Sequence, residues 1–231
     1  MGDAEFLRAR QPEQIQHRRS AILRAAEELL AEDGVDRVSL NAIARRANLA
    51  KSNIYRYFES REQIFLTIHS GEFRDWAGDV KRGLEGLAGR NSAAAAAGVI
   101  ARGFADRERF CELNSVLSMV LEHNVSEDTI LDFKTLAGVG ARGVADSLHR
   151  ALPSVSEERC WWALKMIFAL VAGLWPQTRM SPEVDRVLAR PELQSQRADF
   201  EEDLAGAVRV MLYGLQVEAW RSSGQPVGGG E

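Results

Sequence analysis

The hydrophobic residues of this chain recur every three to four positions through most of its length, a spacing typical of α-helices that bury one face. No alternating apolar and polar run of strand length occurs, so the sequence predicts an all-α fold. Four predicted helices follow a serine whose hydroxyl can cap their first turn: Ser39, Ser60, Ser126 and Ser156. We expect helices over residues 12–33, 40–47, 51–58, 61–87, 92–105, 106–124, 127–152, 157–175 and 199–220, with a partly helical connection over 177–197.

Residues 39–58 are predicted to form two short helices joined by a tight turn. The inward faces of the two helices consist of apolar residues at helical spacing: Leu40, Ile43, Ala44 and Ala47, then Ile54 and Phe58. Asn48 lies where the chain must reverse, and Asn tolerates a left-handed backbone better than most residues. The segment therefore has the pattern of a helix-turn-helix whose second helix enters the major groove of DNA.

The outer surface of the second short helix is unusual for a helix that only meets water. It carries Lys51, Ser52, Asn53, Tyr55, Arg56 and Tyr57. A phenol can donate to a phosphate oxygen, and short polar, lysine and arginine side chains also contact nucleic-acid backbones. These residue types in this arrangement favour a DNA-binding surface.

This pattern resembles the DNA-binding domain of the TetR (tetracycline-repressor) family of bacterial transcription regulators. The matching residues run from Ile22, in AILRAAEELLAEDG, through VSLNAIARRANLAKSNIYRYFESREQIF. The most specific part is YRYF at 55–58, followed by SRE at 60–62 and the apolar pair Ile64-Phe65. The resemblance covers roughly a quarter of the chain. Two positions depart from the family pattern: Ala50 replaces a usual Ser or Thr, which removes a cap and one phosphate contact, and Asn48 replaces a common Gly.

The distribution of charge agrees with one surface that meets nucleic acid. The 231-residue chain has a net charge of −4, yet residues 37–61 hold six basic residues against one acidic residue, Glu59. A basic segment on an acidic chain suits a module that binds DNA at one end only. The other interpretation is an ordinary solvated helix surface.

The resemblance implies roles for individual residues. Ser39 and Arg61 match phosphate-contacting positions, and Lys51, Tyr55 and Tyr57 match positions that contact phosphate or base. Ser52, Asn53 and Arg56 occupy the variable outer positions, and they are our candidates for reading base edges, because Asn suits adenine and Arg suits guanine. Arg45 and Arg46 are expected to add charge toward the DNA backbone.

We expect two domains joined inside a helix rather than by a flexible linker. Residues 1–61 form the predicted DNA-binding domain, in which 1–11 are a disordered arm. Residues 62–221 form the predicted effector-binding and dimerisation domain. The glycine- and serine-rich tail over 222–231 is expected to be disordered.

The last two long predicted helices, about 157–175 and 199–220, are candidates for an interface between two copies of the chain. Residues 160–175 are apolar on almost every side, and a helix of this kind needs cover on every side. The resemblance implies that these helices pair with those of a second copy as a four-helix bundle, and two-fold homodimers are the commonest assembly. A central helix buried within a monomer is the alternative.

The C-terminal half is rich in aromatic and sulfur-bearing side chains for a helical domain. Such residues usually belong to a hydrophobic core, but ligand pockets are lined by the same types. The resemblance implies a cavity for a small, largely apolar effector. The candidate lining residues are Phe73, Trp76, Phe104, Phe110, Met119, His123, Phe133, Trp162 and Met166.

The sequence gives little support for a cofactor site, a metal site or a catalytic site. Residues 138–143 fit GxGxxG by letter but follow a helical pattern rather than a strand, so we interpret the glycines as sites of helix contact or a kink. Cys111 and Cys160 lack metal-site spacing, and the four histidines form no metal or catalytic group. We therefore expect no cofactor, no metal and no enzymatic activity. No signal sequence or membrane span is visible, which favours the cytoplasm.

Taken together, the residues and the resemblance predict a regulator that binds a near-palindromic operator as a homodimer and responds to a small molecule. Family precedent favours repression over activation. Two other classes stay open: a dimeric small-molecule-binding helical protein without specific DNA recognition, and a helical enzyme.

Overall fold

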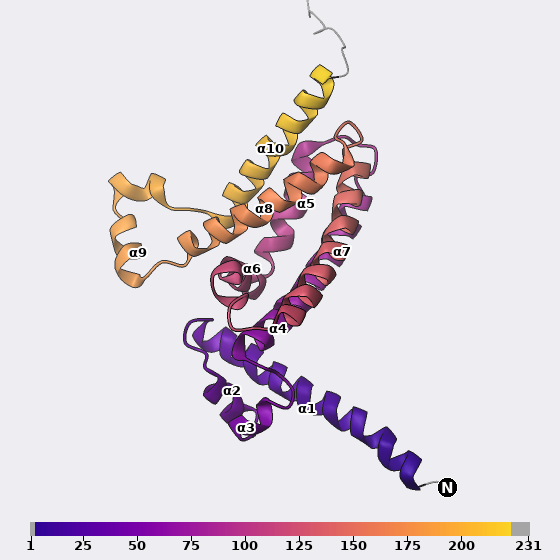
Figure 1. Cartoon of the computed structure of the whole chain (residues 1–231). Coiled ribbons are helices and arrows are strands. Elements are labelled where there is room, and N and C mark those ends of the chain that lie inside the picture. Colours follow the sequence, from indigo (N-terminus) through magenta and orange to yellow (C-terminus); the bar gives the residue numbers. More distant parts are fainter. Residues whose placement is uncertain (1–2, 223–231) are drawn as a thin grey trace, which may run out of the picture. The chain divides into compact units, whose positions relative to one another are not determined.

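The computed structural model describes residues 3–222, with side chains from residue 13 onward. Every regular element within these residues is a helix, which confirms the predicted fold class (Figure 1). The α-helices are α1 Asp3–Asp33, α2 Leu40–Arg46, α3 Lys51–Ile54, α4 Arg61–Glu85, α5 Ala93–Ala105, α6 Glu108–Ser115, α7 Glu127–Ala151, α8 Glu157–Thr178, α9 Pro182–Leu188 and α10 Phe200–Ser222. A π-helix, η1 Leu117–Leu121, precedes α7, and a 3-10 helix, η2 Pro191–Gln196, precedes α10.

The predicted serine caps are present. The hydroxyl of each serine accepts a hydrogen bond from a backbone N–H three residues later: Ser39 from Ala42 at 3.2 Å, Ser60 from Gln63 at 3.1 Å, Ser126 from Thr129 at 3.2 Å, and Ser156 from Arg159 at 3.3 Å. Each bond satisfies one of the N–H groups that the first turn of a helix leaves unpaired.

Three elements differ from the prediction. Helix α1 begins at Asp3, whereas we expected an arm over 1–11; the residues around Arg8 have good helix propensity, and Pro12 does not set the start. Helix α3 ends at Ile54, and single turns continue to Phe58, whose N–H donates to the Ile54 carbonyl at 3.0 Å. The helix expected over 106–124 is divided into α6 and η1. The tail over 223–231 lies outside the described residues.

The chain divides into two compact units. The first unit contains the residues up to Gly71 together with Val116–Phe133, and the second contains Glu72–Ser115 together with the residues from Lys134 onward. Two of the three divisions fall inside helices, in α4 and α7, and the third follows the end of α6. The predicted domain limits, 61/62 and 221/222, stay a prediction, and the sequence did not indicate that residues 116–133 belong with the first unit.

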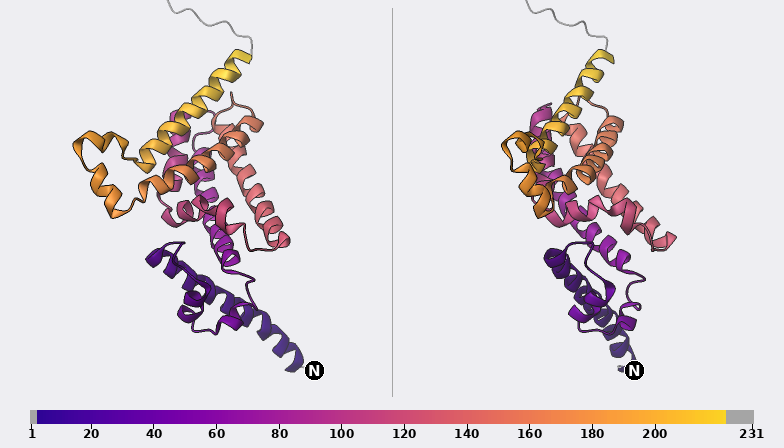
Figure 2. Two further views of the ribbon diagram at one scale, coloured as in Figure 1. Left: turned by 60° about the vertical axis from the view of Figure 1, so that its left-hand side comes forward. Right: turned by 90° about the vertical axis from the view of Figure 1, so that its left-hand side faces the viewer.

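The second unit has a continuous hydrophobic core in which α10 packs along α5 and α8, and α6 packs on α8. Its centre is an aromatic cluster, which we define as Phe73, Trp76, Phe104, Phe110 and Phe168. Within it, the Phe104 and Phe110 rings stack with centroids 5.7 Å apart, and Trp76 meets Phe168 edge-on at 5.0 Å. The connection that carries α9 leaves this core, and no residue of α9 or η2 is buried (Figure 2).

The glycines of the 138–143 run lie in the middle of α7, a helix, so the expected strand–turn–helix context of a dinucleotide site is absent there. A Cβ placed on Gly140 would lie 2.5 Å from Cε1 of Phe73, whereas one placed on Gly138 or Gly143 would have nothing within 4 Å. Gly140 is therefore a site of close helix contact, which is one of the two interpretations drawn from the sequence.

Candidate nucleic-acid interface

The two short helices of the first unit are oriented by a small set of buried apolar residues. Ile43 and Ala44 anchor α2, and Ile54 and Phe58 anchor α3 and the turns that follow it. All four are at most 4% exposed. Because these side chains point inward, the residues between them face solvent, as the helical spacing predicted.

Five of the ten predicted DNA-contacting residues have exposed side chains on α3 and the turns that follow it. We define the recognition segment as residues 51–58. Within it Lys51, Ser52, Asn53, Tyr55 and Arg56 are exposed, and Tyr57 is half-buried. Ser39, which caps α2, is exposed as well. The structure therefore places six of the ten candidate side chains on the recognition segment, whereas Ser39, Arg45, Arg46 and Arg61 lie outside it.

The turn between α2 and α3 has the backbone that the sequence predicted. Asn48 adopts the left-handed conformation, with φ of 53°. The N–H of Leu49 donates to the Ala44 carbonyl at 2.9 Å, which closes the turn. Ala50 is the N-cap residue of α3 and supplies no side-chain hydrogen bond, as expected from its missing hydroxyl.

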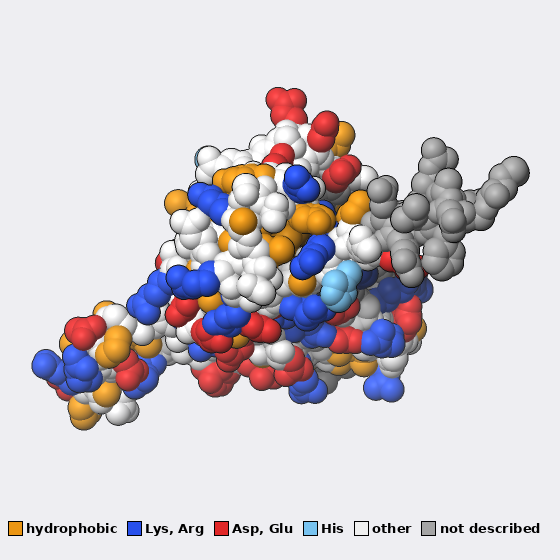
Figure 3. Space-filling model, turned by 90° about the horizontal axis from the view of Figure 1, so that it is seen from below, with side chains coloured by type: hydrophobic (Ala, Val, Ile, Leu, Met, Phe, Trp, Pro, Cys, Tyr) orange, Lys and Arg blue, Asp and Glu red, His pale blue; other side chains and the backbone are white. Residues whose placement is uncertain are grey.

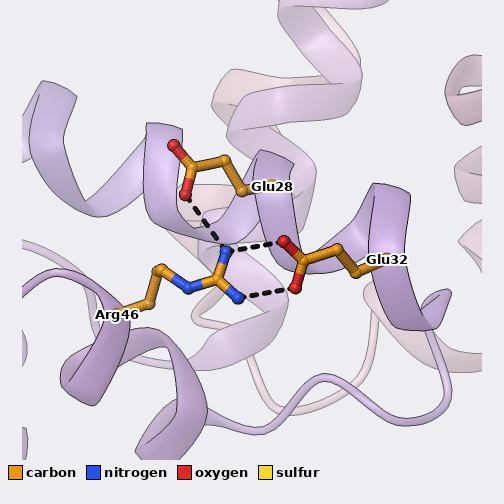
Figure 4. Close-up of polar contacts among 3 residues, drawn as sticks. All are labelled: Glu28, Glu32 and Arg46. Atoms are coloured by element: carbon orange, nitrogen blue, oxygen red, sulfur yellow. Dashed lines mark hydrogen bonds and ion pairs between the residues drawn. The ribbon is translucent and has the colours of Figure 1, made fainter.

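Arg46 has a role that the sequence analysis missed. Its guanidinium binds both oxygens of Glu32, at 3.0 and 2.6 Å, and one oxygen of Glu28 at 3.1 Å (Figure 4). The hydrogen bond from Arg46 lowers the pKa of Glu32. A paired, bidentate contact of this kind fixes α2 against α1. The positive charge of Arg46 is thus offset by two carboxylates, which leaves little of it for a DNA backbone.

Arg61 is also engaged within the protein. Its guanidinium donates to the Val38 carbonyl at 3.0 Å and to a Glu62 oxygen at 3.0 Å. It also lies over the Phe65 ring, 5.4 Å from the centroid. These contacts link the start of α4 to Val38, the residue just before the Ser39 cap, so Arg61 stabilises the packing of α4 against the start of the helix-turn-helix.

Arg19, on α1, is a residue that sequence reasoning did not single out. It donates to the Tyr57 carbonyl at 3.0 Å, and its guanidinium lies 4.2 Å from the centroid of the Phe58 ring. Partial burial lowers the pKa of Arg19. Arg19 therefore fixes the end of the recognition segment against α1. The only sequence signal was a basic residue near the apolar stripe of the first helix.

Side chains of both charges are visible in the space-filling view, where Lys and Arg lie both among uncharged side chains and beside Asp and Glu (Figure 3). The local basic character is therefore a property of residues 37–61, which hold six basic residues against one acidic residue.

The candidate ligand-binding residues are not all in one place. Phe73, Trp76, Phe104 and Phe110 meet in the aromatic cluster of the second unit. On α8, Met166 is half-buried, and Trp162 is 37% exposed, with the Arg159 guanidinium 4.7 Å from its ring. The other three belong to the first unit, where Met119 is 81% exposed, His123 is exposed, and Phe133 is buried beside His69.

Two hollows lie away from these residues. One, of about 800 Å³, lies in the first unit between α1 and Tyr57 and is lined also by Glu13, Gln14, Ile15, His17 and Arg18. The other, of about 440 Å³, lies in the second unit between the start of α5 and α10 and includes Arg209 and Tyr213. Among the described residues, no group of three His, Cys, Asp or Glu side chains is placed to hold a metal ion. No described helix has the length and apolarity that would let it cross a bilayer.

Comparison with known proteins identifies the family. Residues 22–68 match the family model described as bacterial regulatory proteins, tetR family, and residues 70–219 match the model described as tetracyclin repressor-like, C-terminal domain. The second match alone covers more than half of the chain. No curated protein sequence matches the chain.

Several solved structures share the fold. The transcriptional repressor FadR of Thermus thermophilus, solved with lauroyl-CoA, is 17% identical, with a TM-score of 0.58 and 92% of this chain and 99% of that chain covered. RolR, solved with resorcinol, is 18% identical, with a TM-score of 0.54 and coverage of 94% and 98%. The fatty acid degradation regulator FadR of Bacillus halodurans is 14% identical, with a TM-score of 0.53 and coverage of 86% and 96%.

At these identities the structural likeness shows the fold alone, and the family rests on the two sequence matches. They cover the helix-turn-helix and the helices that follow it, and they belong to a family that is not enzymatic. The chain belongs to the tetracycline-repressor family of bacterial regulatory proteins, as a DNA-binding regulator with a ligand-binding C-terminal domain.

Proposed function

We propose that this regulator is a cytoplasmic repressor that binds an operator built as an inverted repeat, through one recognition segment from each copy of a homodimer. The observation that carries the proposal is the recognition segment itself. Its buried anchors, Ile54 and Phe58, leave the polar, tyrosine and basic side chains between them facing outward. Two such segments related by a two-fold axis would read two half-sites about one helical turn apart.

Within the recognition segment, we assign base reading to Ser52, Asn53 and Arg56, and backbone contacts to Lys51 and Tyr55. Ser39, Arg45 and Tyr57 complete the proposed contact set. Arg46 and Arg61 hold the framework through the ion pairs and hydrogen bonds described above. We expect Asn53→Ala to change the preferred base at one operator position more than the general affinity for DNA. A uniform loss across sequences would instead assign Asn53 to the DNA backbone.

The dimer is proposed to form through α8 and α10. The buried face of α10 consists of Leu204, Val208, Leu212 and Leu215. A second stripe at helical spacing faces away from that core: Gly206, Val210, Tyr213 and Gly214, where Val210 is 68% and Tyr213 64% exposed. Small and apolar residues on an outer helix face suit contact with another helix.

Val210→Arg tests this interface, because it places a charge in the centre of the second stripe. We expect the dimer dissociation constant, measured by sedimentation, to rise at least tenfold, which corresponds to about 1.4 kcal/mol. Val184→Arg, the same substitution at an exposed valine of α9, is the matched control. A Val210→Arg dimer as tight as the parent would remove α10 from the interface.

The effector is proposed to be a small, largely apolar molecule held in the second unit. Support comes from the aromatic cluster, from resorcinol, which is named for one similar structure, and from the apolar lauroyl chain of lauroyl-CoA, which is named for another. Binding there would favour a conformer whose two recognition segments no longer match the half-site spacing, which would release the operator.

A further inference from the structure

Residues 116–133 are part of the first unit, although the chain enters and leaves this segment from the second. The segment consists of η1, a reversal in which Asn124 has φ of 59°, and the first part of α7. Helix α7 continues to Ala151, so one helix has its start in the first unit and most of its length in the second. The chain therefore passes from the first unit to the second along the backbone of this helix.

A polar network holds the start of α7. We define the Glu59 network as Glu59, Gln63, Ser126 and Thr129. One carboxylate oxygen of Glu59 accepts from the Ser126 N–H at 2.9 Å and from the Ser126 hydroxyl at 3.3 Å. The Gln63 amide donates to the Thr129 hydroxyl at 3.0 Å, and its oxygen accepts from the Glu59 N–H at 2.8 Å.

The charge of Glu59 suits this position. The N-terminus of a helix carries a partial positive charge and unpaired N–H groups, so a carboxylate is stabilised there. The hydrogen bond from the Ser126 N–H is the main reason why the pKa of Glu59 is lowered, and the hydroxyls of Thr129 and Ser126 add to the effect. Glu59 is thus an ionised cap for α7 that comes from a part of the chain far away in sequence.

Glu59 also directly follows Phe58, the last residue of the recognition segment, and Gln63 lies in the first turn of α4. We propose that Glu59 is a positioning residue that ties the end of the recognition segment to the start of α7, so that a shift of α7 changes how residues 51–58 are presented to DNA. This inference rests on the proposed operator binding, and the contact of Glu59 with the start of α7 is the one through which operator binding would be controlled.

If Glu59 acted only through its negative charge, its removal would be expected to have the opposite effect on DNA binding from the loss of a positioning residue. Glu59 is an exposed acid beside a DNA-binding segment, so its removal should strengthen DNA binding if it acts only by repelling phosphates. A positioning role predicts weaker binding when the hydrogen-bond acceptor is lost. Glu59→Ala removes both the charge and the acceptor, whereas Glu59→Gln removes the charge and keeps an oxygen that can accept from the Ser126 N–H.

The experiment measures operator affinity at fixed salt by fluorescence anisotropy, on a duplex selected by the parent protein. We expect Glu59→Ala to weaken binding about fivefold or more, as for loss of a hydrogen bond to a charged group, and Glu59→Gln to bind within about twofold of the parent. Equal or tighter binding by Glu59→Ala would overturn the positioning role.

Ser126→Ala and Ser156→Ala form a matched pair. Both remove a hydroxyl that caps a long helix with similar geometry, but only Ser126 contacts Glu59. We expect only Ser126→Ala to weaken operator binding, and by less than Glu59→Ala, because the Ser126 N–H still donates to Glu59 when the hydroxyl is lost. Equal effects of the two serine variants would contradict the proposal. This comparison also decides the question if Glu59→Ala fails to fold. If the parent protein selects no duplex, the proposed function is refuted. If the parent selects a duplex and the variants bind it with the parent's affinity, only the role of Glu59 is refuted.

Discussion

Replacement of Gly140 by alanine tests the packing between α7 and the aromatic cluster, because α7 offers its own controls. The added Cβ would lie 2.5 Å from Cε1 and 3.2 Å from Cζ of Phe73, so the ring must move. Phe73 is 5% exposed and contacts Trp76, Phe110 and Phe168, which leaves the ring little room. Overpacking of this kind costs about 1–3 kcal/mol.

The same substitution has a favourable part, since alanine stabilises a helix interior by about 0.5–1 kcal/mol relative to glycine. Gly138→Ala and Gly143→Ala should gain this helix stability without a clash, because a Cβ at either position meets nothing within 4 Å. We therefore expect both controls to be more stable than the parent, and Gly140→Ala to lie about 1–3 kcal/mol below them.

The assay is urea unfolding followed by circular dichroism, with all variants at one protomer concentration, because the proposed dimer would make the stability depend on concentration. Gly140→Ala should unfold at a lower urea concentration than either control. A Gly140→Ala variant as stable as Gly138→Ala would refute the close contact with Phe73, and with it our interpretation of the 138–143 glycines as packing residues.

Three further predictions follow from the described contacts. Arg46→Ala should lower the midpoint temperature of unfolding, because it removes the link from α2 to α1. Arg45→Ala should leave that midpoint unchanged but weaken DNA binding and make it less dependent on salt. The reverse pattern would contradict the roles assigned to the two arginines. Tyr57→Ala should weaken operator binding at least tenfold, or about 1.4 kcal/mol, with the dimer intact, and unchanged affinity would remove it from the contact set. Burial raises the pKa of Cys111 and of Cys160 to about 12, so both thiols should resist iodoacetamide at pH 8 until the protein unfolds; rapid labelling of the native protein would contradict their burial.

The sequence predicted the features that depend on local periodicity. Helical spacing around Ile54 and Phe58 determined which side chains of the recognition segment face outward, and this was confirmed. The caps at Ser39 and Ser126 and the left-handed Asn48 follow from residue-specific backbone preferences, and they were also correct. The family resemblance carried by residues 22–65 was confirmed by the match over 22–68.

Contacts between distant parts of the chain could not be predicted in the same way. Arg45 and Arg46 are adjacent and identical in type, yet only Arg46 is described with carboxylate partners, and these lie on another helix. The pairing of Glu59 with Ser126 joins residues far apart in sequence and has no local signal. The residues that bind the effector stay a prediction, because periodicity identifies apolar positions without separating a core from a pocket.

Selection of duplexes from a random DNA pool by the purified protein, at physiological salt, tests the central claim most directly. The account predicts enrichment of an inverted repeat whose half-sites lie about one helical turn apart, bound by a dimer. Recovery of unselected DNA with a strong dependence on salt, or recovery of no DNA, would contradict sequence-specific operator binding. It would leave a ligand-binding helical protein as the better account of this chain.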